Sequence, residues 1–379
     1  NLAVVIRATA GLCEVVKRHA TGTPTLVVGC DARYGSSEFA TAACRVASAA
    51  GLRVLALPQA NPTPLTSFSM LHFNADAGVM VTASHNPAPD NGYKVYLGGS
   101  VVQGDGRGVQ IVPPFDAEIA AAIEAAPPAD EVPMNDDLIE AVDPREEYVA
   151  CASALASGEA SAREDLRIVL TAMHGVGAAI TSRVLAEAGF TNVSLVAAQA
   201  DPDPDFPTVP FPNPEEAGAL DMAIEQAREQ GADLIIAVDP DADRCALAVP
   251  DPASQTGWSP LSGDQIGSLI GEFLALRGLT GSLANSIVSS RLLSRIARAH
   301  GLEHHTTLTG FKWIARAPGL GFGYEEAIGF CPDPAHVRDK DGIATSVVAA
   351  SLVASLKTQG RSVWDELERL ARLHGLHVS

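Results

Sequence analysis

A serine, a histidine and a lysine follow a short apolar run early in the chain. Residues 79–81 are Val-Met-Val, and they lead into Thr-Ala-Ser-His-Asn-Pro, which contains Ser84 and His85. Proline disfavours helix in the residue before it, so the run predicts a buried strand that ends in a tight turn. The Asn-Gly pair at 91–92 predicts a second turn, which would return Lys94 toward Ser84. A hydroxyl on a stiff turn beside such groups is typical of an activated nucleophile. The alternative is a hairpin whose polar residues only satisfy their own turn.

Three aspartates follow a second apolar run at every other position. Residues 234–238 are all apolar, and the next residues, Asp-Pro-Asp-Ala-Asp-Arg, contain Asp239, Asp241 and Asp243. Carboxylates this close together at the end of a buried strand need a counter-charge. Mg²⁺ prefers oxygen ligands of this kind, so the spacing favours a magnesium site. The alternative is a solvated acidic loop. An EF-hand is excluded because Arg244 stands where that loop requires glycine.

A third stretch with chemical potential lies in residues 307–342. It contains Thr-Gly-Phe-Lys-Trp at 309–313, the adjacent Glu325 and Glu326, and Arg-Asp-Lys-Asp-Gly at 338–342. Paired carboxylates in a glycine-flanked loop can accept hydrogen bonds from sugar hydroxyls, and Lys340 could hold a phosphate. Taken alone, a solvated acidic turn is the default interpretation of these glutamates.

Strands and helices alternate around these stretches. Near the N-terminus the apolar spacing predicts a helix over 2–18, a strand over 25–29, a helix over 39–50 and a strand over 52–57. Strand, helix and strand at these lengths predict a parallel sheet with right-handed crossovers. Arg33 follows a strand's carboxyl end, where open α/β sheets bind ligands. An ion pair with Asp31 explains it equally well.

The later chain repeats this alternation twice. A proline- and acid-rich stretch at 127–144 predicts a connector, and a third unit begins near Leu261, with a short strand expected at 286–289. We therefore expect an α/β protein of three similar units, with mixed or parallel sheets, around one central cleft. The predicted domains are 1–145 with the serine loop, 146–260 with the aspartate loop and 261–379 with the glutamate loop.

Composition limits the classes of partner. The chain has 379 residues, 47% of them hydrophobic, and a formal net charge of −19 without any basic run. General binding to nucleic acid or to an anionic membrane is therefore not expected. No apolar run approaches the roughly 18 residues of a membrane span. The six cysteines show no C-x-x-C spacing, so a reduced, cytoplasmic setting is expected. The chain opens without Met inside an expected helix, and we expect the natural start to be absent.

The three stretches together resemble the α-D-phosphohexomutases, the phosphoglucomutase/phosphomannomutase family. Residues 82–87 with Lys94 are similar to that family's phosphoserine loop, and residues 239–244 to its magnesium loop. Glu325-Glu326-Ala327 resembles its sugar-binding loop, in which serine usually stands at the position of Ala327. The motifs occur in the family's order over essentially the whole chain. Residues 309–313 and 325–329 are closer to a branch with phosphopentomutase-like and glucose-1,6-bisphosphate synthase-like members.

The resemblance implies four domains, of which the usual C-terminal domain is not seen in this chain. Its Arg-x-Ser-Gly-Thr-Glu-Pro-like loop and the usual N-terminal Gly-Thr-Ala-Gly-Leu-Arg-like stretch are both missing. We expect a partial record of a longer protein rather than an impaired member, since the positions that resemble the catalytic Ser, Asp and Lys are all present.

The resemblance also implies a reaction and its residues. A phosphoryl group would move between C1 and C6 of a hexose phosphate through a phosphoserine at Ser84 and a bisphosphate intermediate. Mg²⁺ would be held by Ser84, Asp239, Asp241 and Asp243. His85 and Lys94 would assist catalysis, with the pKa of Lys94 lowered by burial and by Arg244. Substrate-binding candidates are Arg244, Thr309, Gly310, Lys312, Glu325, Ala327, Arg338 and Lys340, and Arg33 is a candidate phosphate contact.

Several alternatives stay open. The same family offers a phosphopentomutase or a sugar-bisphosphate synthase. A haloacid-dehalogenase-type phosphatase also places Asp-x-Asp after an apolar strand, but it leaves Ser84 without a role. A non-catalytic sugar-phosphate binder is the last alternative. The sequence decides neither the preferred sugar nor the oligomeric state.

Overall fold

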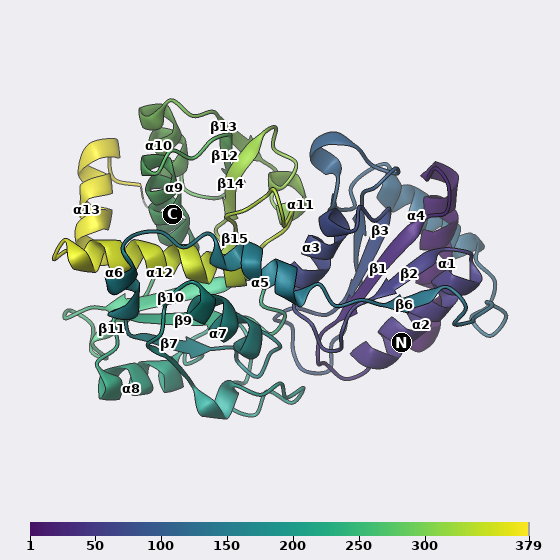
Figure 1. The fold of residues 1–379 in the computed structure, drawn as a ribbon, viewed down its shortest axis with the longest axis horizontal. Coiled ribbons are helices and arrows are strands. Elements are labelled where there is room, and N and C mark those ends of the chain that lie inside the picture. The colour runs from purple at the N-terminus through teal and green to yellow at the C-terminus, as the bar shows by residue number, and fades with distance from the viewer. Residues whose placement is uncertain (378–379) are drawn as a thin grey trace.

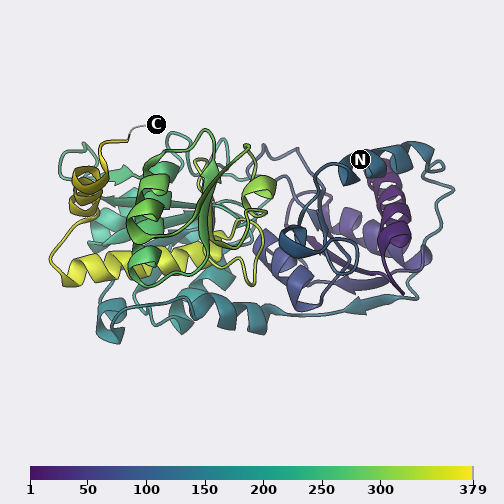
Figure 2. The ribbon, with the colours of Figure 1, turned by 90° about the horizontal axis from the view of Figure 1, so that it is seen from above.

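The computed structural model describes residues 1–377 as three α/β domains, each built on its own sheet. The first sheet lies on the right in Figure 1, and the second and third lie one above the other on the left. Figure 2 shows the chain leaving the first domain along one side of the molecule, from β6 (Ile139–Ala141) to α5 (Arg145–Ser153). No helix among these residues is both long enough and apolar enough to cross a bilayer.

The first domain is a six-stranded sheet in the order β5-β4-β3-β1-β2-β6. Its four parallel strands are β1 (Thr25–Cys30), β2 (Arg53–Ala56), β3 (Ala77–Val81) and β6. Two antiparallel strands, β4 (Lys94–Leu97) and β5 (Val109–Gln110), extend one edge. Its helices are α1 (Leu2–His19), α2 (Ser36–Ala49), α3 (Thr63–His72) and α4 (Phe115–Ala125).

The second domain is a five-stranded sheet in the order β11-β10-β9-β7-β8. Parallel β7 (Ile168–Thr171), β8 (Val193–Leu195) and β9 (Leu234–Val238) are followed by antiparallel β10 (Cys245–Pro250) and β11 (Trp258–Pro260). Its helices are α5, α6 (Ala160–Glu164), α7 (Ala178–Glu187) and α8 (Asp221–Gln230).

The third domain is a four-stranded sheet in the order β13-β12-β14-β15. Parallel β12 (Ser282–Ser286), β13 (His304–Thr307) and β14 (Leu320–Glu325) are joined by antiparallel β15 (Gly329–Cys331). The helices are α9 (Gly263–Leu276), α10 (Leu292–His300), α11 (Phe311–Ile314), α12 (Gly342–Thr358) and α13 (Val363–His374). The largely buried α12 runs between the second and third sheets (Figure 1), so these two domains share one apolar core.

The three sheets share one local pattern that positions the chemistry. In each, a parallel strand is followed by an antiparallel neighbour, and the connecting loop is one of the stretches that the sequence singles out. These loops are residues 82–93 between β3 and β4, 239–244 between β9 and β10, and 326–328 between β14 and β15. Three equivalent strand–loop–strand units therefore carry the serine, the aspartates and the glutamates.

The predicted α/β class and three similar units are confirmed, whereas some elements differ. The third domain's first strand is 282–286 and not 286–289. Its buried positions include the polar Ser282 and Asn285, so the segment lacks the apolar pattern that predicts a buried strand. The connector at 127–144 returns to the first sheet and adds β6 beside β2. Helix α3 was not predicted. Its start after Pro62, with Pro64 at a first-turn position, is typical of a helix N-terminus. The domain boundaries near 145 and 260 stay predictions.

Candidate active site

Ser84 lies in a strained turn directly beyond β3. Its φ is +52°, in the left-handed region that residues other than glycine seldom adopt. The Thr82 hydroxyl accepts a hydrogen bond from the Ser84 N–H at 2.9 Å. The Ser84 hydroxyl donates to Asp239 Oδ2 at 2.9 Å and lies 3.2 Å from His85 Nδ1. The turn thus directs the hydroxyl of the first domain toward the aspartates of the second.

Arg33 is hydrogen-bonded to the serine loop, residues 82–93. Its side chain is buried, and its two terminal nitrogens donate to the carbonyls of four loop residues, Ser84, Asn86, Pro87 and Asp90, at 2.6 to 3.3 Å. The ion pair with Asp31, which was the alternative interpretation of Arg33, is present at 3.5 Å and is buried. Because its terminal N–H groups donate to these carbonyls, Arg33 supports the loop in this structure. Its role as a phosphate contact stays a prediction.

The three aspartates converge in a fully buried cluster. One carboxylate oxygen from each of Asp239, Asp241 and Asp243 lies within 4.8 Å of the others, and each residue is 0% exposed. Burial, together with the neighbouring Asp241 and Asp243, raises the pKa of Asp239 well above its usual value. Burial acts in the same direction on Asp241, but the Lys94 ammonium and its hydrogen bond outweigh it, so the pKa of Asp241 is lowered.

Two lysines from different domains supply counter-charge to this cluster. Lys94 Nζ donates to Asp241 Oδ2 and Asp243 Oδ2, both at 2.7 Å, and Lys340 Nζ lies 3.1 Å from the same oxygen of Asp243. The expected lowering of the Lys94 pKa is wrong in this structure. Although burial lowers that pKa, the charges of Asp241, Asp243 and Asp339 raise it by more.

The donor set fits a hard divalent cation. Asp241 Oδ1 and Asp243 Oδ1 are buried without any hydrogen-bond partner among residues 1–377, and buried carboxylate oxygens left unpaired are costly. Together with Asp239 Oδ2 and the Ser84 hydroxyl they form an all-oxygen set of the kind that Mg²⁺ or Mn²⁺ binds. The cluster can therefore hold a metal ion.

Arg244 connects the aspartate loop with the third domain. Its N–H donates to Asp239 Oδ1 at 3.0 Å, and its guanidinium donates to the carbonyl of Ala327 at 2.8 Å. Burial and the positive charge of Arg244 lower the pKa of His85 to about 4. His85 is consequently a neutral imidazole at neutral pH and can exchange a proton with the Ser84 hydroxyl.

The adjacent glutamates of the third loop have different environments. Glu325 is 7% exposed, and its carboxylate accepts no hydrogen bond from the described residues. Burial raises its pKa, against the positive charges of Lys340 and Arg244 nearby. Glu326 Oε2 instead accepts hydrogen bonds from Ser286 and Ser289 at 2.7 and 2.8 Å. Of the two, Glu325 is the one whose carboxylate is available to a ligand.

Four of the predicted substrate-binding residues make no contact with the cluster in the described part of the chain. The Lys312 ammonium lies 6.0 Å from the centre of the Trp313 ring, Thr309 is exposed, and Gly310 precedes α11 with a φ of +108°. Arg338 donates to the Asp105 carbonyl at 2.7 Å, which joins the third domain to the segment between β4 and β5 of the first. Binding roles for these four residues stay predictions.

Thr63, at the N-terminus of α3, belongs to the site but was not among the predicted site residues. Its hydroxyl donates to Asp241 Oδ2 at 2.6 Å, and its N–H donates to the Asp241 carbonyl at 2.9 Å. The first domain therefore contributes a further hydrogen bond to the aspartate loop. The Pro-Thr-Pro run at 62–64 is the sequence signal for the helix start, but nothing local indicates its partner.

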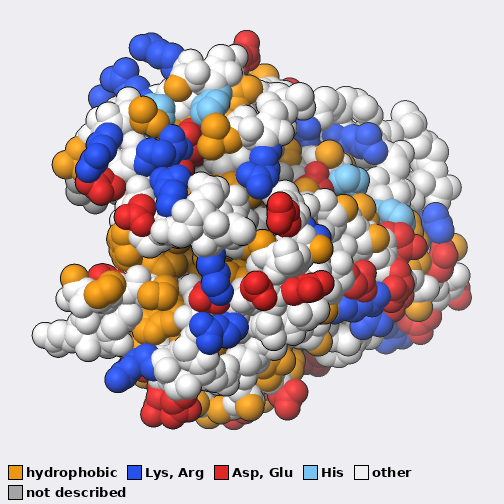
Figure 3. All heavy atoms as spheres, turned by 60° about the vertical axis from the view of Figure 1, so that its left-hand side comes forward, with side chains coloured by type: hydrophobic (Ala, Val, Ile, Leu, Met, Phe, Trp, Pro, Cys, Tyr) orange, Lys and Arg blue, Asp and Glu red, His pale blue; other side chains and the backbone are white. Residues whose placement is uncertain are grey.

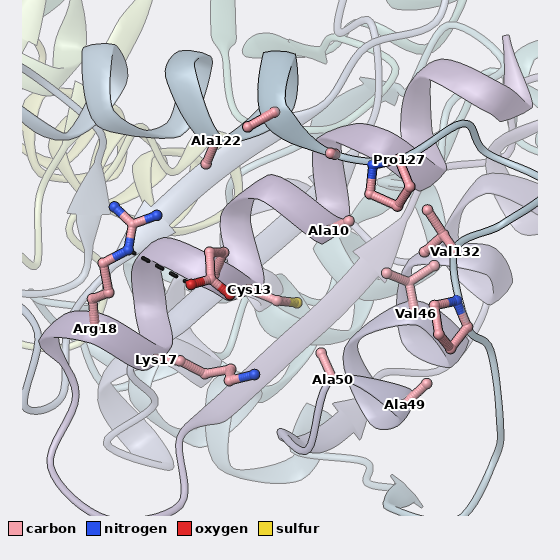
Figure 4. A pocket seen from close by; sticks show the side chains of 14 residues that line it. Ala10, Cys13, Lys17, Arg18, Val46, Ala49, Ala50, Ala122, Pro127 and Val132 are labelled. Atoms are coloured by element: carbon pink, nitrogen blue, oxygen red, sulfur yellow. Dashed lines mark ion pairs between the residues drawn. The ribbon is translucent and has the colours of Figure 1, made fainter.

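A cavity in the first domain lies apart from this site. A cavity of about 350 Å³ between α1, α2 and α4 is lined mainly by small apolar side chains such as Ala10, Ala49 and Ala122, with a Glu14–Arg18 ion pair at its rim (Figure 4). None of its lining residues belongs to the aspartate cluster. On the face in Figure 3, acidic and basic side chains are interspersed.

Family models match three successive parts of the chain. Residues 1–129, 146–253 and 262–373 match the phosphoglucomutase/phosphomannomutase alpha/beta/alpha domains I, II and III, respectively. A crystal structure of a "putative phosphomannomutase" from Thermus thermophilus superposes with a TM-score of 0.82 at 26% identity, covering 99% of this chain and 80% of that one.

Curated relatives carry several mutase names. The chain is 44% identical to the "Probable phosphomannomutase" of Haemophilus influenzae over 100% of this chain and 77% of the relative. It is 38% identical to the phosphoribomutase of Saccharomyces cerevisiae, over 92% of this chain and 61% of the relative. It is 32% identical to the human phosphopentomutase, over 100% of this chain and 66% of the relative. With three matching domains in order and a curated relative at 44% identity, this chain belongs to the phosphoglucomutase/phosphomannomutase family, the α-D-phosphohexomutases.

Proposed function

We propose that this chain provides the phosphoryl-transfer centre of a phosphosugar mutase that works through a phosphoserine at Ser84 and a sugar bisphosphate. One observation carries the proposal: the Ser84 hydroxyl lies 2.9 Å from Asp239 Oδ2, although the two residues are 155 positions apart. A nucleophilic oxygen, a cluster of acidic metal ligands and a ring of cations are the parts that phosphoryl transfer requires.

The reaction exchanges one P–O bond for another. The bond between phosphorus and Ser84 Oγ breaks while a bond to a hydroxyl of the sugar monophosphate forms, and the bisphosphate results. The sugar hydroxyl loses its proton and Ser84 Oγ gains one, so the transfer needs a proton acceptor and a donor. His85 Nδ1 is 3.2 Å from that oxygen and suits the serine side. Lys94 is the candidate for the sugar hydroxyl, a role that requires its neutral amine. A cation held by Asp241 and Asp243 would compete for the negative charges that raise the pKa of Lys94. After the intermediate turns around, its other phosphoryl group returns to Ser84.

Asp239, Asp241 and Asp243 would hold the cation, for which we propose Mg²⁺. When bound, it stabilises the charge that builds on the transferring group. Arg244 and Lys340 reach the cluster from two domains and suit the phosphate oxygens of the substrate. Glu325 suits sugar hydroxyls because its buried carboxylate accepts no hydrogen bond from the described residues.

A hexose 1- or 6-phosphate, of glucose or mannose, is the first proposed substrate, in a reduced cytoplasmic setting. The phosphomannomutase name of the 44% identical relative supports it. A pentose phosphate is the second, supported by the relatives named phosphoribomutase and phosphopentomutase. The chain spans 61 to 77% of the length of these relatives, so the activity of the whole protein is part of the proposal.

Intact mass spectrometry and a substrate panel test the function together. The purified protein is incubated with glucose 1,6-bisphosphate and Mg²⁺, and a mass gain of one phosphoryl group is expected in the wild type but not in Ser84→Ala. Interconversion is then assayed with the 1-phosphates of glucose, mannose, ribose and deoxyribose.

Three outcomes would count against the proposal. Turnover that persists in Ser84→Ala supports an aspartate-dependent phosphatase instead. Binding of sugar phosphate without any modification of Ser84 supports a non-catalytic binder. Net formation of bisphosphate without interconversion supports a synthase of the same family.

A further inference from the structure

A buried hydrogen bond joins Tyr96 and Asp339, two residues that lie close in sequence to Lys94 and Lys340 of the site. The Tyr96 hydroxyl donates to Asp339 Oδ2 at 2.7 Å, and both residues are buried, at 0% and 2% exposure. Tyr96 belongs to the first domain and Asp339 to the third, 243 positions later. A buried phenol and a buried carboxylate that satisfy each other across a domain boundary fix the relative position of their backbones.

Each partner is joined through the backbone to a lysine of the site. Tyr96 and Lys94 are alternate residues of β4 and therefore share a face of that strand. Asp339 directly precedes Lys340, and its Oδ1 accepts a hydrogen bond from the Lys340 N–H at 2.8 Å. Both ammonium groups then reach Asp243 Oδ2, at 2.7 and 3.1 Å. The contacts close a ring through all three domains.

The edge strand next to β4 reinforces this ring. Gln110 of β5 pairs with Tyr96 in the sheet and donates to the same Asp339 oxygen at 2.8 Å. Arg316, which follows α11, donates to the Gln110 carbonyl, also at 2.8 Å. Asp339 is thus the shared acceptor for two side chains of the β4–β5 pair. Both bonds cross from the first domain to the third, so they contribute to the arrangement of the domains.

We propose that Tyr96 and Asp339 are positioning residues that set the separation of Lys94 and Lys340 at Asp243. This rests on the proposed function, in which Lys94 serves the sugar hydroxyl and Lys340 the phosphate oxygens of the substrate. Small displacements of reacting groups cost large factors in rate. The bond should therefore affect turnover beyond its effect on stability.

The chain offers a closely matched control. The Tyr148 hydroxyl also donates to an aspartate of the same segment, Asp341 Oδ1, at 2.9 Å, and Tyr148 is 1% exposed. Asp341 caps α12, and its side chain forms no ion pair with a lysine within residues 1–377. Tyr96→Phe and Tyr148→Phe remove the same group from the same kind of buried bond.

The test compares kcat, KM and melting temperature for these two variants with a sugar 1-phosphate that the wild type converts. We expect similar losses of melting temperature. Tyr96→Phe should lower kcat on the order of 10-fold, with KM changed less than about twofold, whereas Tyr148→Phe should leave kcat within about twofold. Asp339→Asn, which can still accept from Tyr96, should retain more activity than Asp339→Ala. Equal kcat values for Tyr96→Phe and Tyr148→Phe would overturn the inference.

Hydrogen–deuterium exchange separates this inference from the proposed function. If the wild type converts none of the sugar phosphates tested, the proposed function fails, and exchange alone then decides the positioning. Tyr96→Phe should accelerate exchange both in β4 and at residues 338–342. Acceleration confined to β4, or its absence, would contradict the link between the domains.

Discussion

Glu325 and Glu326 are neighbours with the same side chain but different surroundings. Hydrogen bonds from Ser286 and Ser289 hold Glu326 to the end of β12, while Glu325 lies buried near the cations of the site without such a bond from the described residues. The same substitution at both positions therefore distinguishes a carboxylate that is available to a ligand from one that is held by the protein.

We predict that Glu325→Gln raises KM for the sugar phosphate at least about 10-fold, since hydrogen bonds to a charged acceptor contribute roughly 1.5–3 kcal/mol. Glu326→Gln should change KM little and instead lower the melting temperature, because it weakens the attachment of the 286–289 turn. Steady-state kinetics and thermal unfolding of both variants check this. A larger KM effect for Glu326→Gln would contradict the assignment.

Helix α3 is the element that carries the first domain to the aspartate loop. It begins at Thr63, whose hydroxyl and N–H both bond Asp241. Thr66, one turn later, is equally buried but bonds within its own domain, to Asn61 and Met80. The two threonines distinguish a role at the cation cluster from a general role in packing.

We predict that Thr63→Val weakens Mg²⁺ binding on the order of 10-fold, the usual effect of removing a hydrogen bond to a metal ligand. Thr66→Val should lose stability, by about 1 kcal/mol, without losing Mg²⁺ affinity. Calorimetric titration with Mg²⁺ measures the affinities, and equal affinities for the two variants would refute the prediction.

Helix α12 begins at a carboxylate that titrates near neutrality. Burial raises the pKa of Asp341 to about 7, although the Ala344 N–H and the Tyr148 hydroxyl donate to it. The folded protein therefore binds a proton that the unfolded chain releases near pH 4. Stability should fall as the pH rises from about 4 to about 7, by up to about 1.4 kcal/mol per pH unit, and stay reduced above that range.

We predict that Asp341→Asn flattens this pH dependence, because asparagine retains the helix cap and cannot ionise. The variant should be more stable than the wild type at pH 8 and show a smaller difference at pH 4. Denaturant unfolding across this pH range measures it. Parallel stability curves for the two proteins would show that Asp341 does not titrate there.

At the scale of the whole molecule, the site belongs to no single domain. Ser84 comes from the first sheet, the aspartates from the second, and Glu325 and Lys340 from the third domain. A cation held between the Ser84 hydroxyl and the aspartates would bind only when the first two domains are correctly apposed, so metal binding and domain arrangement are linked.

We predict that saturating Mg²⁺ raises the melting temperature relative to the protein in EDTA, since a ligand at one hundred times its Kd adds about 2.7 kcal/mol. Asp239→Ala should abolish most of this shift. Differential scanning calorimetry of both proteins, with and without Mg²⁺, tests the linkage. An equal Mg²⁺ shift in Asp239→Ala would place the responsible ion elsewhere.

The sequence by itself determined the local parts of this protein. Apolar runs that end in Ser-His-Asn-Pro or Asp-Pro-Asp-Ala-Asp predicted buried strands and their loops, because strand and turn preferences act over a few neighbouring residues. The strand predicted at 286–289 was misplaced relative to β12 for the same reason: a buried strand that contains serine and asparagine lacks the local apolar pattern from which strands are predicted.

Only the tertiary structure decided how these parts pair. The carboxylates beside Lys94 lie 147 and 149 positions away in the chain. Their charges raise the pKa of Lys94, whereas the sequence had led us to expect that burial and Arg244 would lower it. Arg33 bonds loop carbonyls, and Tyr96 finds Asp339 across a domain boundary. Charge and hydrogen-bonding capacity can be read from residue types. The partner that satisfies them is set by the packing of three domains, which brings together residues that have no local relation in the chain.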